Sequence, residues 1–192
     1  MSDPVSSPAR SPLARLAHAA HWAAKAHKDQ QRKGIDAEPY VNHCLEVAEL
    51  VLSADDPGSV DVAIAALLHD TVEDVGVTRD DLVEIFGERV AELVMFVTDD
   101  KTETKEARKR HQIEHAPHLP RDARLIKIAD KTSNLRALVR TPPAGWGPER
   151  LADYVIWAEA VVAACGATDA ALEALFHAAH AEAARAHPRP GV

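Results

Sequence analysis

Apolar residues recur along the chain at the three- and four-residue spacing that is typical of amphipathic helices. This spacing predicts one helix from Leu13 to about Gln30 and another from Val41 to Ser53. The segment from Val60 to about Asp74 is apolar nearly all round, which indicates a helix buried in the centre of the protein. Further helices are predicted between Thr78 and Gly87 and over residues 88–97, 103–115, 120–139, 149–165 and 169–185.

Loops that contain Gly and Pro separate these helices, at residues 31–39, 55–58 and 141–148. Alanine, the best helix former, supplies 36 of the 192 residues, whereas strand-forming aromatic residues make up only 4%. The chain contains no repeat, no convincing strand and no linker long enough to separate two domains. The sequence therefore predicts an all-α protein, a single compact helical bundle over residues 13–186.

The two ends of the chain differ from this pattern. Residues 1–12 contain three Pro and four Ser without an apolar run, and we expect them to be a disordered tail, as we expect a short C-terminal tail over 187–192. Neither a signal peptide nor a stretch of 18 apolar residues is present, so we expect no membrane span and a cytoplasmic protein. Cys44 and Cys165 lie in apolar helical patterns and are expected to be core residues rather than a disulfide.

The charge of the chain is unevenly distributed. The 30 Asp and Glu residues outnumber the 22 Lys and Arg residues, and a net charge of -8 argues against a partner that is a nucleic-acid polymer. Residues 101–140 are the exception, with 11 basic and 5 acidic residues. This basic segment is either a solvated helix face or one wall of a site for a small anion.

Polar residues interrupt the apolar pattern at a few positions where chemistry is expected. His69 and Asp70 follow the buried segment directly, and Glu73 and Asp74 come one turn later. His69 and Glu73 have i, i+4 spacing, and so do Asp70 and Asp74. We therefore expect the four side chains to project from one side of one helix. Two more polar residues interrupt apolar patterns in other predicted helices: His43 and Asp130. Asn134 follows Asp130 by one turn.

Each of these residues taken alone is compatible with a core polar group that has its hydrogen bonds satisfied. Together they would bury several carboxylates and two imidazoles without a partner cation, and such burial is unfavourable. A divalent cation resolves the conflict, and the predicted ligands are His43, His69, Asp70 and Asp130. This mixed nitrogen and oxygen set suits Mn²⁺ or Fe²⁺, allows Zn²⁺ and is less natural for Mg²⁺. A structural zinc site is disfavoured because the set has no Cys.

Longer strings around these residues resemble a known family. The HD pair within AALLHDTVEDVGVT, together with PYVNH and LIKIADKTSNLRAL, is similar to the HD superfamily of metal-dependent phosphohydrolases. With QRKG, FGERVAELVMFVTDDK, RKRHQIEHAP and TPPAGW added, the order resembles the hydrolase domains of RelA/SpoT-type proteins. The stand-alone small alarmone hydrolases, including the metazoan SpoT-homologue type, are the most similar group, and the resemblance spans roughly residues 13–176.

The resemblance implies an all-α HD domain and a reaction. Members of this family remove the 3′-pyrophosphate of guanosine tetra- or pentaphosphate, (p)ppGpp, with Mn²⁺ as the usual cofactor and GDP or GTP as the product. By position, His43, His69, Asp70 and Asp130 match the metal ligands, and Glu73 and Asp74 match the paired catalytic acids. The other matched positions contact the small guanine nucleotide: Arg32, Lys33, Asn134 near the ribose, and Lys105, Lys109, Arg150 and Tyr154 along the nucleotide pocket.

The chain departs from some relatives at Thr132-Ser133, where those relatives have Leu-Tyr, and we expect the base pocket to differ on that side. No residues are left over for a synthetase domain, so we expect this protein to degrade the alarmone and not to make it.

Three other interpretations remain open. The first is an HD phosphohydrolase for another nucleotide, such as the 2′-phosphate of NADPH or a nucleoside monophosphate; Arg32-Lys33 and the strings around Asp130 favour the alarmone instead. The second is a regulatory HD module that binds nucleotide without hydrolysing it, although all six metal and acid positions are present. The third, a purely structural helical protein, is disfavoured by the buried charges. The sequence leaves open whether the protein is a monomer or a homodimer.

Overall fold

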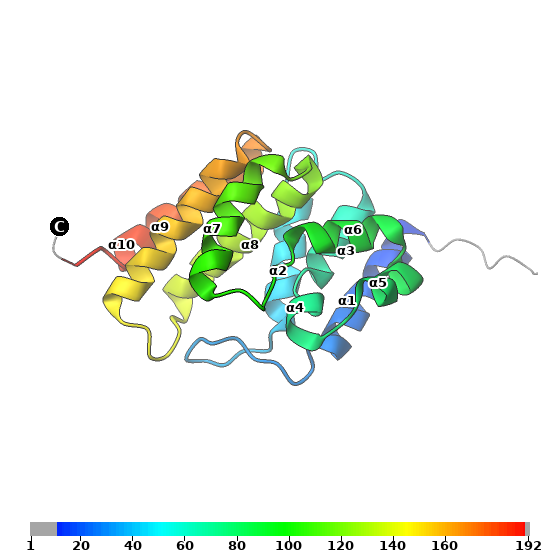
Figure 1. The fold of residues 1–192 in the computed structure, drawn as a ribbon, viewed down its shortest axis with the longest axis horizontal. Coiled ribbons are helices and arrows are strands. Elements are labelled where there is room, and N and C mark those ends of the chain that lie inside the picture. Colours follow the sequence, from blue (N-terminus) through cyan, green and yellow to red (C-terminus); the bar gives the residue numbers. More distant parts are fainter. Residues whose placement is uncertain (1–10, 191–192) are drawn as a thin grey trace, which may run out of the picture.

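The computed structural model describes residues 11–190, which form α-helices joined by short loops (Figure 1). The first half of the chain contributes α1 (Pro12–Ala26), α2 (Val41–Leu52), α3 (Val60–Leu68), α4 (Thr71–Val75), α5 (Arg79–Phe86) and α6 (Glu88–Val97). The second half contributes α7 (Lys105–His115), the 3-10 turn η1 (Ala116–His118), α8 (Arg121–Arg140), α9 (Pro148–Cys165) and α10 (Ala170–Ala186). The all-α prediction is confirmed, because the only β-structure in residues 11–190 is two isolated bridges.

Two helix predictions are corrected. The first helix ends at Ala26 rather than near Gln30, and the segment predicted as one helix over 60–74 is divided into α3 and α4. At the division, His69 Nδ1 bonds to the carbonyl oxygen of Ala66 at 2.8 Å, and Thr71 Oγ1 donates to that of Leu68 at 2.7 Å. These bonds between side chains and nearby carbonyls compete with the regular helical hydrogen bonds, so the helical segment is interrupted at His69 and Asp70.

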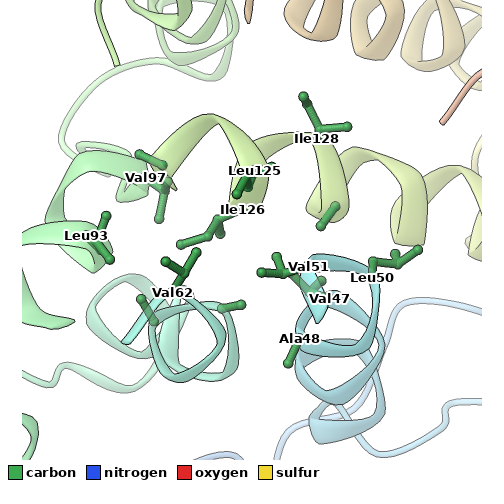
Figure 2. Close-up of a cluster of buried hydrophobic side chains, with 14 of the residues drawn as sticks. Val47, Ala48, Leu50, Val51, Val62, Leu93, Val97, Leu125, Ile126 and Ile128 are labelled. Carbon is green, nitrogen blue, oxygen red and sulfur yellow. The ribbon is translucent and has the colours of Figure 1, made fainter. Parts of the chain in front are cut away.

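The core forms where α2, α3, α6 and α8 meet (Figure 2). In α3 all residues from Val62 to Leu68 are buried, as the apolar pattern predicts for a central helix. Aliphatic side chains such as Val51, Leu93 and Ile126 interdigitate between these helices, and aromatic residues contribute little to this region. The twenty-residue α8 packs against α2, α3, α6, α9 and α10, so it connects the two ends of the molecule.

Two loops lie side by side at one edge of the bundle. The segment 27–40 after α1 and the segment 141–147 after α8 run next to each other along the lower edge in Figure 1. An antiparallel bridge joins Gly34 to Pro143, and the amide of Ala144 donates to the carbonyl oxygen of Lys33. The paired loops therefore bring residues 27–40 and residues 141–147 together, although they are about 100 positions apart in the sequence.

The predictions for the chain ends, the cysteines and membrane spans can also be compared with the structure. Residues 1–10 and 191–192, which make up most of the predicted N-terminal tail and part of the C-terminal one, lie outside the described residues. Ser11 caps α1 and Pro12 begins it. Cys44 and Cys165 are both buried and free, as predicted. Among the described helices, none has the length and apolar character needed to cross a membrane.

Candidate active site

Three helices bring His43, His69 and Asp130 together from positions far apart in the sequence. His43 lies in the first turn of α2, His69 at the end of α3 and Asp130 in the middle of α8. One ligand atom from each residue lies within 4.8 Å of the others. His43 Nε2 is 3.3 Å and His69 Nε2 is 3.8 Å from Asp130 Oδ1, so both rings point their Nε2 atoms at one carboxylate.

The fourth predicted ligand, Asp70, lies at the edge of this group. Its Oδ2 atom is 3.1 Å from His69 Nε2 and 3.7 Å from His43 Nε2. The same oxygen accepts a hydrogen bond from the hydroxyl of Tyr40. Burial and the charge of Asp70 both raise the pKa of Tyr40, so this phenol stays protonated and remains a donor.

The residues present fit a divalent cation. His69 Nε2 is buried and makes no hydrogen bond within the described residues, although Asp70 Oδ2 lies 3.1 Å away; Nδ1 of the same ring bonds to the Ala66 carbonyl. His43 Nδ1 is likewise engaged, by Ser133 Oγ at 2.9 Å. Two imidazoles whose second nitrogen is fixed, facing carboxylates, form the donor set that divalent transition metals bind in proteins.

The electrostatics of the group agree with this interpretation. Burial and the neighbouring His69 ring lower the pKa of His43. Burial opposes a charge on His69, yet Asp70 and Asp130 raise its pKa to about 9. Lys131 and the two imidazoles hold the pKa of Asp130 well below its usual range, although burial acts against them. In the metal-free chain a proton on His69 therefore balances the carboxylates, and metal binding releases such protons.

The two predicted acids face different spaces. Glu73 lines the same cavity of about 160 Å³ as the histidines, and burial raises its pKa to about 7. Asp74 lines a neighbouring cavity of about 310 Å³, where it accepts a hydrogen bond from Gln30 Nε2 at 2.7 Å and pairs with Lys101. The expectation that both acids project with His69 and Asp70 from one side of a single helix is wrong, because the helix is divided at His69.

The larger cavity collects most of the predicted substrate contacts. Arg32, Lys33, Asn134 and Tyr154 all line it, beneath the paired loops. Tyr40 and Asn134 line both cavities, so the predicted metal ligands and the basic lining belong to one continuous site. At this junction an Arg32 Nη2 atom donates to Asn134 Oδ1 at 2.9 Å, and Asn134 Nδ2 donates to Asp130 Oδ1 at 2.6 Å.

The remaining predicted contacts lie on aromatic rings at the side of this cavity. Arg150 and Lys105 approach the ring of Trp146, a cavity-lining residue, at 4.2 and 5.5 Å from its centroid. Lys109 lies 4.9 Å from the centroid of Trp157. The rings of Trp146, Tyr154 and Trp157 follow one another at 5.3 to 5.7 Å. The structure thus groups these three cations in one place without putting them in the cavity lining.

Comparison with known proteins places this site in a family. The model of the HD domain family matches residues 19–158. The chain belongs to the HD domain family. Its relatives include the protein named guanosine-3′,5′-bis(diphosphate) 3′-pyrophosphohydrolase MESH1 of Danio rerio, 44% identical over 85% of this chain and 91% of that protein. The human protein of the same name is 45% identical over 87% of this chain and 94% of its own length.

Solved structures show the same relationship. The structure of a metazoan orthologue of SpoT that hydrolyses ppGpp has a TM-score of 0.83 and 40% sequence identity, over 91% of this chain and 98% of that one. The protein lmo0812 of Listeria monocytogenes has a TM-score of 0.64 and 27% identity, over 77% of this chain and 99% of its own. The helical bundle described above is therefore the fold of an HD domain.

Sequence reasoning missed several residues of this HD domain site. Lys127 and Lys131 are buried, line the smaller cavity and flank Asp130 on one face of α8. Lys131 Nζ donates to Asp130 Oδ2 at 2.8 Å, and Lys127 Nζ donates to the carbonyl oxygen of Val97 at 3.0 Å. The available signal was their spacing, since Lys127 stands three residues before Asp130 and Lys131 three residues before Asn134. The basic segment 101–140 is thus partly a wall of the site.

The expectation for Thr132-Ser133 is also corrected. Both residues are fully buried, and neither lines either of the two cavities. Thr132 Oγ1 donates to the carbonyl oxygen of Ile128 in its own helix at 2.8 Å. Ser133 instead contacts His43 and Glu46 of α2, so the difference at this position bears on the surroundings of His43, a predicted metal ligand, rather than on the lining of either cavity.

Proposed function

We propose that this HD domain is a divalent-metal-dependent (p)ppGpp 3′-pyrophosphohydrolase that releases pyrophosphate and leaves GDP or GTP. The observation that carries the proposal is the continuity of the site, in which a cluster of two imidazoles and carboxylates opens past Tyr40 and Asn134 into a cavity lined by Arg32 and Lys33. An elongated, highly charged nucleotide matches such a site, with the scissile group at the cluster. The identity of 44% and 45% to the two MESH1 proteins described above supports the choice of substrate.

In this proposal His43, His69, Asp70 and Asp130 hold the cation, with Mn²⁺ as the first choice and Zn²⁺ or Fe²⁺ as alternatives. The cation supplies Lewis-acid polarisation and activation of water when bound. Tyr40 orients the Asp70 carboxylate through its hydroxyl. Since the substrate is a cellular nucleotide, we also propose a cytoplasmic location.

The two acids take separate roles. Burial raises the pKa of Glu73 to about 7 in the metal-free chain, so this carboxyl group holds a proton more readily than an exposed glutamate. A carboxylic acid of this kind can donate a proton to the departing ribose 3′-oxygen. Asp74 bonds to Gln30 and Lys101, and it is suited to orient water or the ribose at the junction of the cavities.

The cations are arranged to bind phosphate along the length of the substrate. We assign Lys127 and Lys131, beside the cluster, to the 3′-pyrophosphate, because their ammonium groups are the cations that line the smaller cavity. Arg32, Lys33, Asn134 and Tyr154 bind the nucleotide in the larger cavity, and Lys105, Lys109 and Arg150 extend the basic surface over the aromatic rings. Developing negative charge in the transition state is stabilised by such fixed cations.

A substrate panel tests the proposal. The purified chain is stripped with EDTA, reloaded with Mn²⁺, Zn²⁺, Fe²⁺ or Mg²⁺, and assayed for release of pyrophosphate or phosphate from ppGpp, pppGpp, NADPH and nucleoside monophosphates. We expect rapid release of pyrophosphate from ppGpp and pppGpp with Mn²⁺. Preferential hydrolysis of NADPH or of a monophosphate would replace the proposal, and binding without turnover of any compound would identify a non-catalytic module.

Variants make the panel specific to the site. Glu73→Gln combined with Asp74→Asn should abolish turnover while metal binding is retained. Glu182→Gln, an exposed position on α10, serves as the control and should match the wild type. Unchanged hydrolysis by the double variant would refute the assignment of the acids.

A further inference from the structure

A chain of hydrogen bonds leads away from the buried His43 ring on the side opposite the proposed cation. His43 Nδ1 lies 2.9 Å from Ser133 Oγ, and Ser133 Oγ lies 2.8 Å from Glu46 Oε2. The Glu46 carboxylate in turn pairs with Arg136 at 3.3 Å and with Arg140 at 3.2 Å. The chain therefore runs from a buried ring on α2, through α8, to an exposed arginine at the end of α8.

The direction of each hydrogen bond follows from the chemistry of the groups. A carboxylate paired with two guanidinium groups is ionised, and an ionised carboxylate only accepts hydrogen bonds. The Ser133 hydroxyl must therefore donate its proton to Glu46. Its oxygen is then left with lone pairs only, so it accepts from His43 Nδ1–H. The proton of the neutral ring is on Nδ1, and the lone pair is on Nε2.

This tautomer points the His43 lone pair at the cluster. His43 Nε2 faces Asp130 and Asp70, the other proposed ligands, at 3.3 and 3.7 Å. His69 reaches the same state by a different device, since its Nδ1 bonds to the carbonyl oxygen of Ala66, a main-chain group that no side-chain substitution removes. His43 depends instead on two side chains.

We propose that Ser133 and Glu46 are positioning residues that hold His43 in the tautomer and orientation needed to bind a divalent cation. The inference rests on the metal site of the proposed function, although it does not depend on the identity of the substrate. Partners of this kind behind metal-binding histidines fix the ring and raise its basicity, and their loss typically weakens metal binding by about tenfold to a hundredfold.

The competing explanation is that the Ser133 hydroxyl has a purely structural role. The neighbouring Thr132 is an example of a buried hydroxyl with such a role. Thr132 is equally buried, yet its hydroxyl bonds within its own helix to the Ile128 carbonyl. A serine in a helix can satisfy its hydroxyl in that way. Ser133 instead reaches across to α2 for both of its contacts.

The pair Ser133→Ala and Thr132→Val provides a matched test. Each substitution removes one fully buried hydroxyl from the same turn of α8, but only the first removes the partner of His43. Mn²⁺ affinity is measured on the purified full chain from the electron paramagnetic resonance signal of free Mn²⁺. We expect Ser133→Ala to bind about tenfold to a hundredfold more weakly than the wild type. Thr132→Val should bind like the wild type.

A second variant and a spectroscopic measurement guard against unfolding as the cause. Glu46→Gln preserves shape, and its amide oxygen can still accept from Ser133, so we expect a smaller loss of affinity than in Ser133→Ala; Glu49→Gln, exposed on the same helix, is its control. Long-range proton–nitrogen correlation spectra of the imidazoles should show Nδ1-protonated His43 in the metal-free wild type. That preference should be lost in Ser133→Ala.

The outcomes separate this inference from the proposed function. Equal Mn²⁺ affinity in Ser133→Ala and Thr132→Val, or His43 protonated on Nε2 in the wild type, would overturn the inference. A wild-type chain that binds no divalent cation would overturn it too. A chain that binds Mn²⁺ and shows the expected loss in Ser133→Ala, yet hydrolyses no (p)ppGpp, would support the inference while refuting the proposed substrate.

Discussion

The carboxylate of Glu73 accepts a hydrogen bond of 2.6 Å from the backbone amide of Asp99, which ties the short helix α4 to the loop after α6. Asp99 is itself held by Gln112 Nε2 at 2.6 Å and has Lys127 Nζ at 4.0 Å. Glu73 is thus held at the wall of the smaller cavity, where it is partly buried. Burial raises its pKa to about 7 even though the amide of Asp99 acts in the opposite direction.

This raised pKa predicts a pH dependence of stability in the metal-free chain. Between the ordinary value of 4.5 and about 7, the folded chain keeps a proton on Glu73 that the unfolded chain has released, so stability falls as the pH rises through this window. Glu73→Gln is neutral at every pH and removes this loss. After allowance for partial exposure, we expect Glu73→Gln to gain about 1–2 kcal/mol relative to the wild type on going from pH 5 to pH 8.

Urea unfolding in EDTA at the two pH values measures this difference. Glu84→Gln, exposed on α5, is the control and should show the same difference from wild type at both pH values. A difference between Glu73→Gln and wild type that did not change with pH would show that Glu73 is not the buried titrating group.

The helices and the centre of the site were predictable because they depend on local patterns. The three-residue group of His43, His69 and Asp130 could be identified since each interrupts an apolar helical face, and an interruption of that kind needs a partner. The break at His69 was not predictable, because periodicity does not reveal the bonds that His69 and Thr71 make to backbone carbonyls. A helical pattern looks the same with or without them.

Other parts of the site depend on contacts between distant segments. Buried lysines such as Lys127 and Lys131 resemble surface residues in a sequence, since lysine is rarely buried. Only the packing of α8 against its neighbours shows that they face a cavity. The same holds for Ser133, whose contacts with His43 and Glu46 span about 90 positions of the sequence.

Arg150 offers a prediction about substrate affinity. Its guanidinium group lies 4.2 Å from the ring centroid of Trp146, beside the larger cavity but outside the cluster of proposed metal ligands. Arg150→Gln should therefore raise KM for ppGpp by about tenfold and leave kcat nearly unchanged, because a cation in this place binds substrate and transition state alike. The effect should shrink at high salt. Arg185→Gln, exposed on α10, is the control; an effect confined to kcat would contradict the placement of Arg150.

Asp169 offers a prediction about the fold. This buried residue is the N-cap of α10 and accepts hydrogen bonds from the backbone amides of Asp55, Asp56 and Leu172, each at 3.1 Å. Burial acts to raise the pKa of Asp169, but these amides and Arg121 hold it below its usual value. The stabilisation from its charge is therefore present at neutral pH and is lost as the pH falls through the lowered pKa.

Asp169→Asn should accordingly lower the free energy of unfolding by about 1–3 kcal/mol at pH 7 and by less at pH 3. Thermal unfolding of the variant and of Asp153→Asn, an exposed control on α9, measures the difference. Equal effects of Asp169→Asn at the two pH values would mean that the charge of Asp169 does not contribute.

Gly34 tests whether the paired loops shape the larger cavity. A Cβ atom at this position would come within 2.6 Å of the Thr141 carbonyl oxygen and 2.5 Å of its hydroxyl, which is too close for either atom. Gly34→Ala must therefore push the loop 141–147 away from the loop 27–40, and with it Pro143 and the neighbouring Trp146. The proposed metal ligands lie on helices or in the short break between α3 and α4, and they should stay in place.

We therefore expect Gly34→Ala to raise KM for ppGpp by about tenfold, because the loop that lines the larger cavity is displaced. Its Mn²⁺ affinity should stay at the wild-type value, because the proposed metal ligands are not displaced. Gly147→Ala is the matched control in the same region. Its added Cβ would meet nothing closer than Glu149 Oε2 at 4.0 Å. Steady-state kinetics and Mn²⁺ titration of both variants check the prediction. If the KM values of the two variants rose equally, close contact between the loops would not be what shapes the cavity; if Gly34→Ala lost Mn²⁺ affinity, the loops and the cluster would form a single unit.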